Sequence, residues 1–382
     1  MNRDLKVMSV FGTRPEAVKM APLVLELQRR DGIDSTVCVT AQHREMLDSV
    51  LDIFRIKPDY DLDVMEPGQT LSGITTRVMN GMGEVFDSAK PDVVLVHGDT
   101  STTFSAALAA FYQQISVGHV EAGLRTWDKY SPWPEEMNRQ MVGRIADFHF
   151  SPTLQNSENL KNEGINKGIF ITGNTAIDAL KYTVGDGTFS NEVLSSLDFD
   201  NRRVITMTCH RRENYGEPME NIFAAARRII NDFPDVELVY PVHLSPVVQY
   251  AASRYLSKAE RIHLIDPLDV VEMHRLMAKS YMVMTDSGGL QEEAPALGKP
   301  TLVLRKETER PEAVAAGTVE LAGIEEENIY DLAAQLLTNK EKYDCMAQAV
   351  NPYGDGNASA RIADALLWSF DMQPQRPEDF RV

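Results

Sequence analysis

Residues 6–17 read KVMSVFGTRPEA, and the rest of the chain repeats the pattern that they begin. The apolar run Lys6–Phe11 predicts a buried strand, Gly12 permits a tight turn, and Ala17–Arg30 has the amphipathic spacing of a helix. Pro15 suits the start of that helix, because the first N–H groups of a helix are unpaired and proline has none to lose. The stretch therefore predicts a strand that passes directly into a covering helix.

The same alternation runs through two halves of the chain. In the first half it predicts strands at Ser35–Thr40, Asp92–His97, Ser116–Val120 and Phe148–Ser151, and helices at Glu45–Phe54 and Thr102–Gln113. In the second half it predicts strands at Arg203–Thr208, Val236–Pro241, Arg261–Ile265, Met282–Thr285 and Thr301–Leu304, with a helix at Met219–Asp232. Continuous apolar strands between helices are typical of parallel sheets covered on both faces. We therefore expect an α/β fold of two Rossmann-like, doubly wound domains that face a cleft with the carboxyl ends of their strands.

Composition suggests where the domains change. Residues 182–201 are rich in Gly, Ser, Asp and Asn, which is typical of a junction. We expect an N-terminal domain at residues 1–174 and a C-terminal domain at residues 175–355. A last helix is predicted at Ala358–Phe370, and the polar residues 373–382 predict a mobile tail.

Charge and cysteine content limit the ligands and the compartment. The 38 Lys and Arg residues stand against 56 Asp and Glu residues, a net charge of −18, so the chain repels nucleic acid and anionic membranes at long range. Cys38, Cys209 and Cys345 form no CxxC pair, which favours neither disulfides nor a zinc ribbon and fits the reducing cytoplasm. We read no signal peptide and no transmembrane helix.

Two glycine turns follow apolar strands, and each has two interpretations. At residues 12–17, backbone N–H groups with Arg14 and Lys19 could hold an anion, or the segment is an ordinary strand-to-helix turn. At residues 285–294, Ser287-Gly288-Gly289 lets a ligand approach the backbone, and Glu293 can accept bonds from ribose hydroxyls. The alternative is a helix cap at Ser287; we favour the ligand, because a cap needs only one of these features. Neither turn matches GxGxxG or GxxxxGK[ST], which disfavours a nicotinamide cofactor or a P-loop.

Carboxylates follow the strands of the first half. Asp99 and Glu121 each come just past an apolar strand, and Glu135 follows a stiff Trp-Pro pair. Paired carboxylates in a cleft can have their pKa values pushed apart, which supplies one acid and one base. Each alone is more simply a cap or a surface charge, but two at adjacent strand ends favour a catalytic site.

Cationic groups follow the strands of the second half. His210 and Arg211 come directly after one strand, and Arg310 precedes a proline-started helix. They could bind a diphosphate, whereas the alternative is a structural histidine with surface arginines. The eight histidines show neither HExxH nor Cys/His ligand spacing, so we expect no metal and no cofactor. Cys209 is interpreted as a small buried residue.

Seven motifs follow one another along the chain: FGTRPEA (11–17), TAQHR (40–44), VHGDT (96–100), GHVEAGLR (118–125), HRREN (210–214), DSGG (286–289) and NPYGDG (351–356). Together they resemble the non-hydrolysing bacterial UDP-N-acetylglucosamine 2-epimerases. The resemblance runs from about Lys6 to Leu367 and implies a glycosyltransferase-B-like fold whose C-terminal helix, about residues 356–372, packs back on the first domain. It also implies a homodimer that interconverts UDP-GlcNAc and UDP-ManNAc and so supplies ManNAc for cell-surface polysaccharide.

The resemblance implies three sets of site residues. The reaction site would be lined by Arg14, Lys19, Asp99, Glu121, Glu135, Arg139 and His210. UDP would be held by Leu268, Met273, Ser287, Gly288, Gly289, Glu293 and Arg310. Some members of the family are activated by a second UDP-GlcNAc, and the matching positions are Gln42, Glu45, Gly68, Glu136, Arg211 and His243. Glu45 and Gly68 stand where activated members carry Gln and Arg, so the chain departs from that pattern.

The chemistry suggests a mechanism. The C2 proton of the sugar is not next to a carbonyl, so its direct removal is very unfavourable. Loss of UDP from C1 builds positive charge there and acidifies C2–H; a carboxylate then takes the proton, and re-addition with a proton on the other face gives the epimer. We expect Arg14, His210 and Arg310 to stabilise the diphosphate, and Asp99, Glu121 and Glu135 to act as base, acid and cation stabiliser, in an order that the sequence leaves open. The rival hypotheses are a glycosyltransferase that uses a UDP-sugar, a hydrolysing epimerase and a nucleotide-sugar sensor.

Overall fold

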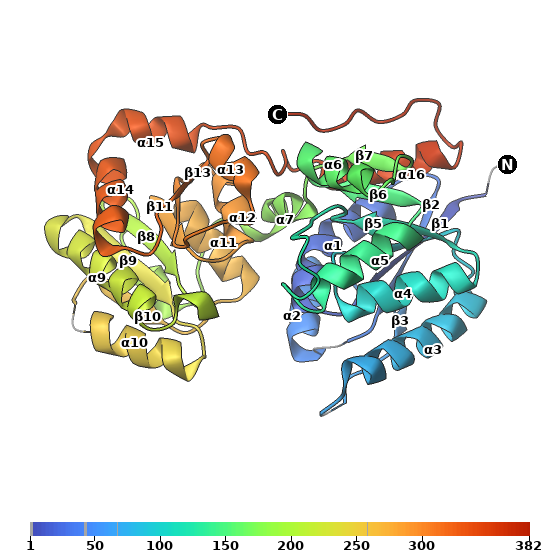
Figure 1. Ribbon diagram of the computed structural model, residues 1–382, viewed down its shortest axis with the longest axis horizontal. Helices are drawn as coiled ribbons and strands as arrows, with labels where there is room; N and C mark the ends of the chain where they lie inside the picture. Colours follow the sequence, from blue (N-terminus) through green and yellow to red (C-terminus); the bar gives the residue numbers. More distant parts are fainter. Residues whose placement is uncertain (1–2, 42–43, 67, 258) are drawn as a thin grey trace. The chain divides into compact units, whose positions relative to one another are not determined.

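The computed structural model describes residues 3–41, 44–66, 68–257 and 259–382 and contains two compact units (Figure 1). Unit 1 consists of the chain up to Tyr182 together with Tyr353–Arg381, and unit 2 consists of Thr183–Pro352. The first boundary between unit 1 and unit 2 lies at the end of helix α7 (Thr175–Thr183). The domain boundary predicted from the sequence, at residues 174–175, lies at the beginning of that helix.

Unit 1 is built on a parallel sheet. Its strand order in the described chain is β3-β2-β1-β4-β5-β6-β7. The strands are β1 (Leu5–Phe11), β2 (Ile33–Val39), β3 (Tyr60–Asp61), β4 (Val93–His97), β5 (Ser116–Val120), β6 (Phe148–Ser151) and β7 (Ile169–Ile171). The strand order reverses direction between β1 and β4, which is the place where doubly wound sheets bind ligands.

The helices of unit 1 connect these strands. They are α1 (Arg14–Gln28), α2 (Arg44–Phe54), α3 (Leu71–Ala89), α4 (Ser101–Tyr112), α5 (Glu135–Ile145), α6 (Leu154–Asn162), most of α7, and α16 (Ala358–Ser369) from the far end of the chain. Apolar side chains of α3, α4 and α5 share one buried cluster with strands β1, β2 and β4. Helix α1 packs instead against α2 and α16.

Unit 2 is also built on a parallel sheet, with the order β10-β9-β8-β11-β12-β13 in the described chain. Its strands are β8 (Arg203–Thr208), β9 (Val236–Pro241), β10 (Ile262–Ile265), β11 (Met282–Thr285), β12 (Thr301–Val303) and β13 (Val319–Leu321). Its helices are α8 (Glu192–Ser196), the 3-10 turn η1 (Arg212–Asn214), α9 (Glu217–Asp232), α10 (Pro246–Leu256), α11 (Val270–Lys279), α12 (Leu290–Ala296), α13 (Pro311–Ala315), α14 (Glu326–Thr338) and α15 (Lys340–Ala347). Here the order reverses direction between β8 and β11.

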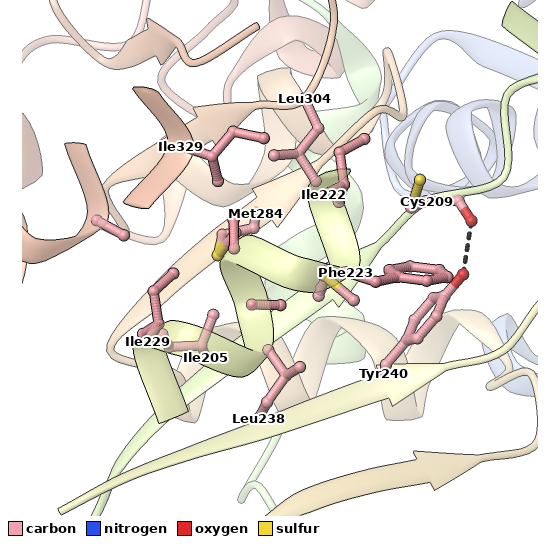
Figure 2. Packing of buried hydrophobic residues seen from close by; sticks show 14 of the residues in the cluster. Ile205, Cys209, Ile222, Phe223, Ile229, Leu238, Tyr240, Met284, Leu304 and Ile329 are labelled. Atoms are coloured by element: carbon pink, nitrogen blue, oxygen red, sulfur yellow. Dashed lines mark hydrogen bonds between the residues drawn. The ribbon is translucent and has the colours of Figure 1, made fainter. Parts of the chain in front are cut away.

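The core of unit 2 fixes the end of β8. Figure 2 shows Phe223 of α9 and Tyr240 of β9 packed together in this core, with ring centroids 5.6 Å apart. The Tyr240 hydroxyl donates a 2.6 Å hydrogen bond to the backbone carbonyl of Cys209, the first residue after β8 (Figure 2). Cys209 itself is fully buried, as its small size predicts. The chain is therefore anchored to the core immediately before His210.

The predicted α/β architecture with two doubly wound halves is confirmed in each unit. Every predicted strand is present, and β5, β6, β8, β9 and β11 have the predicted bounds. The sequence pattern gave no sign of β3, β7 and β13, which have only two or three residues and carry no periodicity of their own. Helix α1 begins at Arg14, before the predicted start at Ala17, because Thr13 and Glu16 form a capping box.

The segment predicted as a mobile tail makes specific contacts with unit 1. The backbone N–H of Phe380 donates to the carbonyl of Ile171, and the N–H of Ile171 donates to the Asp379 carboxylate. Phe380 is buried, and the Arg376 guanidinium lies over the ring of Phe170. The end of the chain thus pairs with edge strand β7 in this structure.

Within the described ranges, no helix combines the length and the apolar character that crossing a membrane requires.

Candidate active site

Glu121 lies one residue past β5, and its carboxylate contacts side chains from three other segments of unit 1. The ammonium group of Lys19, on α1, forms an ion pair with it, and the amide of Asn174 donates a 3.0 Å hydrogen bond to the same carboxylate. His97, the last residue of β4, places its Nε2 3.7 Å from the other carboxylate oxygen. Glu121 has φ +63°, a left-handed conformation that is uncommon for a residue with a side chain. The fold therefore holds this carboxylate beside one ammonium group, one amide donor and one imidazole.

The surroundings of Glu121 keep it ionised. Burial acts to raise the pKa of its carboxyl, but the charge of Lys19 and the hydrogen bonds from Lys19 and Asn174 outweigh burial and hold that pKa well below its ordinary value. Burial lowers the pKa of His97 to about 4, so this imidazole is neutral near pH 7. The site thus contains a carboxylate anion beside one fixed cation.

Asp99 lies two residues past β4 and is partly exposed. The guanidinium of Arg139 donates a 2.5 Å hydrogen bond to its carboxylate, and the side-chain amide of Asn138 donates to its backbone carbonyl at 2.9 Å. His119, the last but one residue of β5, contacts the carbonyl of Gly98 through its Nε2 at 2.8 Å. Helix α5 and strand β5 therefore hold the turn that carries Asp99 from two sides.

The two glutamates at the start of α5 differ in environment. Glu135 is half-buried as the first residue of the helix. Glu136 is fully buried and accepts hydrogen bonds from the backbone N–H groups of Thr126 and Trp127 and from the side chain of Gln140. In this structure Glu136 therefore organises the loop that leads to α5.

The turn between β1 and α1 differs from its anion-binding interpretation. The N–H groups of Gly12 and Thr13 donate to the carboxylate of Glu16 at 3.2 and 2.8 Å, so an intramolecular carboxylate already occupies them. Glu16 is buried, which raises the pKa of its carboxyl, and it also accepts from the hydroxyl of Thr100 at the β4–α4 turn. These two N–H groups therefore behave as in an ordinary strand-to-helix turn, and Arg14, exposed in the first turn of α1, is a cation that the turn presents.

His210 lies two residues past β8, beside the end of β11. Its ring stacks on that of His243, with centroids 5.3 Å apart, and its Nε2 lies 3.9 Å from the carboxylate of Asp286. Burial lowers the pKa of His210, and His243 and Arg211 act in the same direction, whereas Asp286 raises it. Arg211 and His243, which match the activation set, are thus neighbours of a proposed reaction-site residue.

The Ser287-Gly288-Gly289 turn follows β11. The residue that caps α12 is Gly289, which makes no side-chain cap bond, so the alternative of a Ser287 cap is wrong. The guanidinium of Arg310 lies over Gly288, where a Cβ would meet it at 3.1 Å, and it donates to Glu292 at 2.8 Å. This close approach explains a glycine at position 288.

Glu293, on α12, lies close to α11. His274 of that helix is buried and places its Nε2 3.4 Å from the Glu293 carboxylate, while its Nδ1 contacts the hydroxyl of Thr183 at 2.7 Å. Leu268 and Met273 are half-buried and pack against the apolar clusters beside this region. The proposed UDP-binding residues of unit 2 thus lie around the carboxyl ends of its strands and the start of α12.

Several contacting residues were not assigned roles from the sequence, among them His97, Asn174, His274 and Asp286. His97 and Asp286 stand inside quoted motifs, next to residues that were chosen, whereas nothing local distinguishes Asn174 or His274. Gln42 lies outside the described residues, and so does the side chain of Glu45. Gly68 has φ +72°, and a Cβ added to it would meet no atom of the described residues within 4 Å. No cluster of three His, Cys, Asp or Glu side chains that could hold a metal ion occurs in the part of the chain that the structure describes.

The comparisons with known proteins span both units. A family model described as UDP-N-acetylglucosamine 2-epimerase matches residues 25–367. The UDP-N-acetylglucosamine 2-epimerase of Bacillus subtilis is 60% identical over 379 residues, which cover 99% of each chain. The crystal structure of a Listeria monocytogenes protein assigned as a UDP-N-acetylglucosamine 2-epimerase is 57% identical with a TM-score of 0.94, and the match covers 99% of this chain and 100% of that one. The Neisseria meningitidis UDP-GlcNAc 2-epimerase, solved with UDP-GlcNAc bound, is 50% identical with a TM-score of 0.86, over 95% of this chain and 100% of its own.

Proposed function

The chain belongs to the UDP-N-acetylglucosamine 2-epimerase family, and from this membership we propose that it interconverts UDP-GlcNAc and UDP-ManNAc by eliminating UDP and adding it back. The relatives named for this activity cover nearly the whole chain, and one of them was solved with UDP-GlcNAc bound. The proposal needs no cofactor, because the leaving diphosphate itself acidifies the C2 proton.

The single observation that carries the mechanism is a pair of anchored carboxylates at the ends of adjacent strands. Arg139 holds Asp99 past β4, and Lys19 holds Glu121 past β5. As the C1–O bond breaks, its electron pair goes to UDP, and the positive charge that develops at C1 needs nearby fixed negative charge. We assign that role to the Glu121 anion together with Asp99 and Glu135, one of which takes the C2 proton.

Unit 2 supplies the nucleotide contacts in this proposal. The Ser287-Gly288-Gly289 turn would approach the diphosphate, Glu293 would accept the ribose hydroxyls, and Leu268 and Met273 would contact the base. His210 and Arg310 would stabilise the charge of departing UDP. The ion pair between Arg310 and Glu292 supports a pre-oriented guanidinium, since an anchored cation needs little rearrangement when an anion arrives.

The test is incubation with UDP-GlcNAc in deuterated water, followed by proton NMR. We expect UDP-ManNAc at equilibrium and deuterium at C2 of both sugars, because the proton removed is replaced from solvent. Free ManNAc would identify a hydrolysing epimerase. No label with intact substrate would exclude epimerisation and leave a glycosyltransferase or a sensor. The Glu121→Gln variant, purified and incubated in the same way, is the matched control for a contaminating epimerase.

We also propose a homodimer in a reducing compartment, the cytoplasm. The cysteine pattern supports the compartment, since Cys38, Cys209 and Cys345 are all free thiols. Light scattering during size-exclusion chromatography tests the dimer: a mass of twice 42.7 kDa is expected, and a monomer at micromolar concentration would overturn it. Activation by a second UDP-GlcNAc stays a prediction of the resemblance; it would appear as a sigmoidal dependence of rate on UDP-GlcNAc, and Arg211→Ala would remove the sigmoidal component.

A further inference from the structure

Asp286 is a completely buried carboxylate at the switch point of the unit 2 sheet. It follows β11 directly, its backbone N–H donates to the carbonyl of Thr208 at the end of β8, and its side chain is 0% exposed. Strands β8 and β11 are the neighbours between which the strand order reverses. An aspartate at this point costs desolvation energy unless its oxygens have partners, so each oxygen requires an explanation.

One oxygen of Asp286 organises the segment after β8. Its Oδ2 accepts hydrogen bonds from the backbone N–H groups of His210 and Arg211, both at 2.7 Å, and from the side chain of Asn214 at 3.1 Å. The Tyr240 hydroxyl donates to the carbonyl of Cys209, so the backbone is hydrogen-bonded on both sides of His210. This oxygen therefore has a structural role and is fully occupied.

The other oxygen has no such role. Among the described residues, Asp286 Oδ1 is buried and has no hydrogen-bond partner. The nearest cationic candidate is His210, whose Nε2 lies 3.9 Å away and whose side chain is 37% exposed. A carboxylate this close to an imidazole favours the protonated, charged form of the histidine.

The other groups that face His210 act against its charged form. His243, which follows β9, stacks on the ring, and Arg211 is the next residue in the chain. Partial burial of the ring has the same effect, and together these influences outweigh Asp286, so the pKa of His210 lies below its ordinary value. Among the charged neighbours in the described part of the chain, Asp286 is the one that favours the cation, so removing its charge should lower the pKa of His210 further.

We propose that Asp286 is the positioning residue and counterion of His210, holding the imidazole as a hydrogen-bond donor to the diphosphate that leaves C1. This inference rests on the proposed function. In that step the C1–O electron pair passes to the β-phosphate oxygen, the C2 proton passes to a carboxylate of unit 1, and the protonated form of His210 donates a hydrogen bond to the new anion and keeps its proton. Asp286 acts only through His210 and contacts no substrate in this assignment.

The test compares Asp286→Asn with the unchanged protein by NMR titration of isotope-labelled histidine, with His210→Gln to identify the signal. Asparagine can keep the three bonds to Oδ2 but replaces the charge with an amide. We expect the titration midpoint of His210 to move to lower pH. Because activity is lost as pH rises through the pKa of His210, the high-pH limb of the kcat profile should move to lower pH as well. At neutral pH we expect kcat to fall about 10-fold or more, up to the roughly 100-fold typical of losing a positioned donor, with a smaller change in KM.

The matched control is Asp266→Asn, an exposed carboxylate after β10 in the same unit, which should leave the His210 midpoint and the kcat profile unchanged. An unchanged midpoint in Asp286→Asn would overturn the proposal. The proposed function can fail independently of this pairing. If the unchanged protein does not epimerise UDP-GlcNAc, that function is refuted, but the titration still shows whether Asp286 raises the pKa of His210.

A second measurement covers an Asp286→Asn protein that does not fold. In the unchanged protein with 13C-labelled aspartate, the Asp286 carboxyl signal should show an inflection at the pH where His210 titrates. In His210→Gln this inflection should disappear. Absence of the inflection from the unchanged protein would also overturn the pairing.

Discussion

Glu121 combines a buried charge with a left-handed backbone, and both features carry a cost. A positive φ in a residue with a side chain costs about 1–3 kcal/mol, and such strain is retained where surrounding contacts over-determine the conformation. Lys19 and Asn174 provide those contacts on the carboxylate. A strained, ionised side chain at the end of a central strand is therefore better explained by use in chemistry than by stability.

Replacing the Glu121 carboxylate with an amide tests its role directly. Glu121→Gln keeps size and a hydrogen-bond acceptor but removes the negative charge, so we expect kcat to fall about 100- to 10,000-fold. UDP affinity, measured by calorimetry, should change little because the nucleotide contacts are assigned to unit 2. The control is Glu158→Gln, an exposed carboxylate on α6, which should retain activity. Full activity in Glu121→Gln would contradict the assignment.

Removing the cation beside Glu121 should change the pH dependence. In Lys19→Met, burial acts without the opposing charge, so the pKa of Glu121 rises and the carboxylate takes up a proton at higher pH. If the reaction requires ionised Glu121, the low-pH limb of the kcat/KM profile should move to higher pH. Lys161→Met on the exposed face of α6 is the control and should leave the profile in place. A profile that keeps its low-pH limb in Lys19→Met would show that Glu121 does not control it.

At the scale of elements, helix α16 is capped by a residue 180 positions away in sequence. Its own N-cap, Asn357, makes no side-chain cap bond. Instead the carboxylate of Asp178 on α7 accepts from the N–H groups of Ala358 and Ser359 at 3.1 and 2.8 Å. Two backbone donors at the start of α16 thus depend on α7, the helix at the end of the first segment of unit 1.

Loss of this cap should destabilise unit 1. In Asp178→Ala the two buried N–H groups lose their acceptor, and we expect a loss of about 2 kcal/mol in the free energy of unfolding of this unit, measured by urea denaturation. Asp178→Asn should lose less, because it keeps an acceptor and because burial raises the pKa of Asp178, which makes the charged form costly as pH rises. Asp87→Ala, exposed on α3, is the control. Equal stability of Asp178→Ala and the control would show that the cap contributes nothing.

At the scale of the whole molecule, the two units differ in continuity. Unit 2 is one uninterrupted segment, whereas unit 1 requires the returning residues 353–381. Ile362, Ala363 and Leu366 of α16 are fully buried, and the end of the chain pairs with β7. Unit 1 therefore cannot be completed until the chain has passed through unit 2.

Fragments should reflect this difference. Residues 183–352 produced alone should fold and bind UDP, because their sheet, both helical layers and proposed nucleotide contacts are internal. Residues 1–182 alone should show a poorly dispersed NMR spectrum, because the surface that α16 covers would be exposed. Adding a peptide of residues 353–382 should improve the dispersion. A well-folded 1–182 fragment would contradict this view of the core.

Local patterns were sufficient for much of the fold and less of the site. Apolar runs and turn chemistry identified the longer strands, because a buried strand of five or six residues leaves a recognisable hydrophobic run. Three-residue strands such as β7 and β13 were missed, since their pairing partners rather than their own sequence make them strands. For the site, the quoted motifs included Asp99, Glu121 and His210 but gave no hint of Asn174 or His274.

The chain's sequence alone determined two doubly wound halves, the turns after their strands, and the family to which the chain belongs, because these properties reside in periodicity and in contiguous motifs. Only the tertiary structure decided which donors are occupied and which charges are paired. Glu16 takes two N–H groups that one of the two interpretations gave to an anion, Lys19 pairs with Glu121 from 102 residues away, and Asp286 lies near His210 at the ends of two adjacent strands. Hydrogen bonds and pKa shifts act over a few ångströms in space, so they are set by the packing of distant segments rather than by neighbours in sequence.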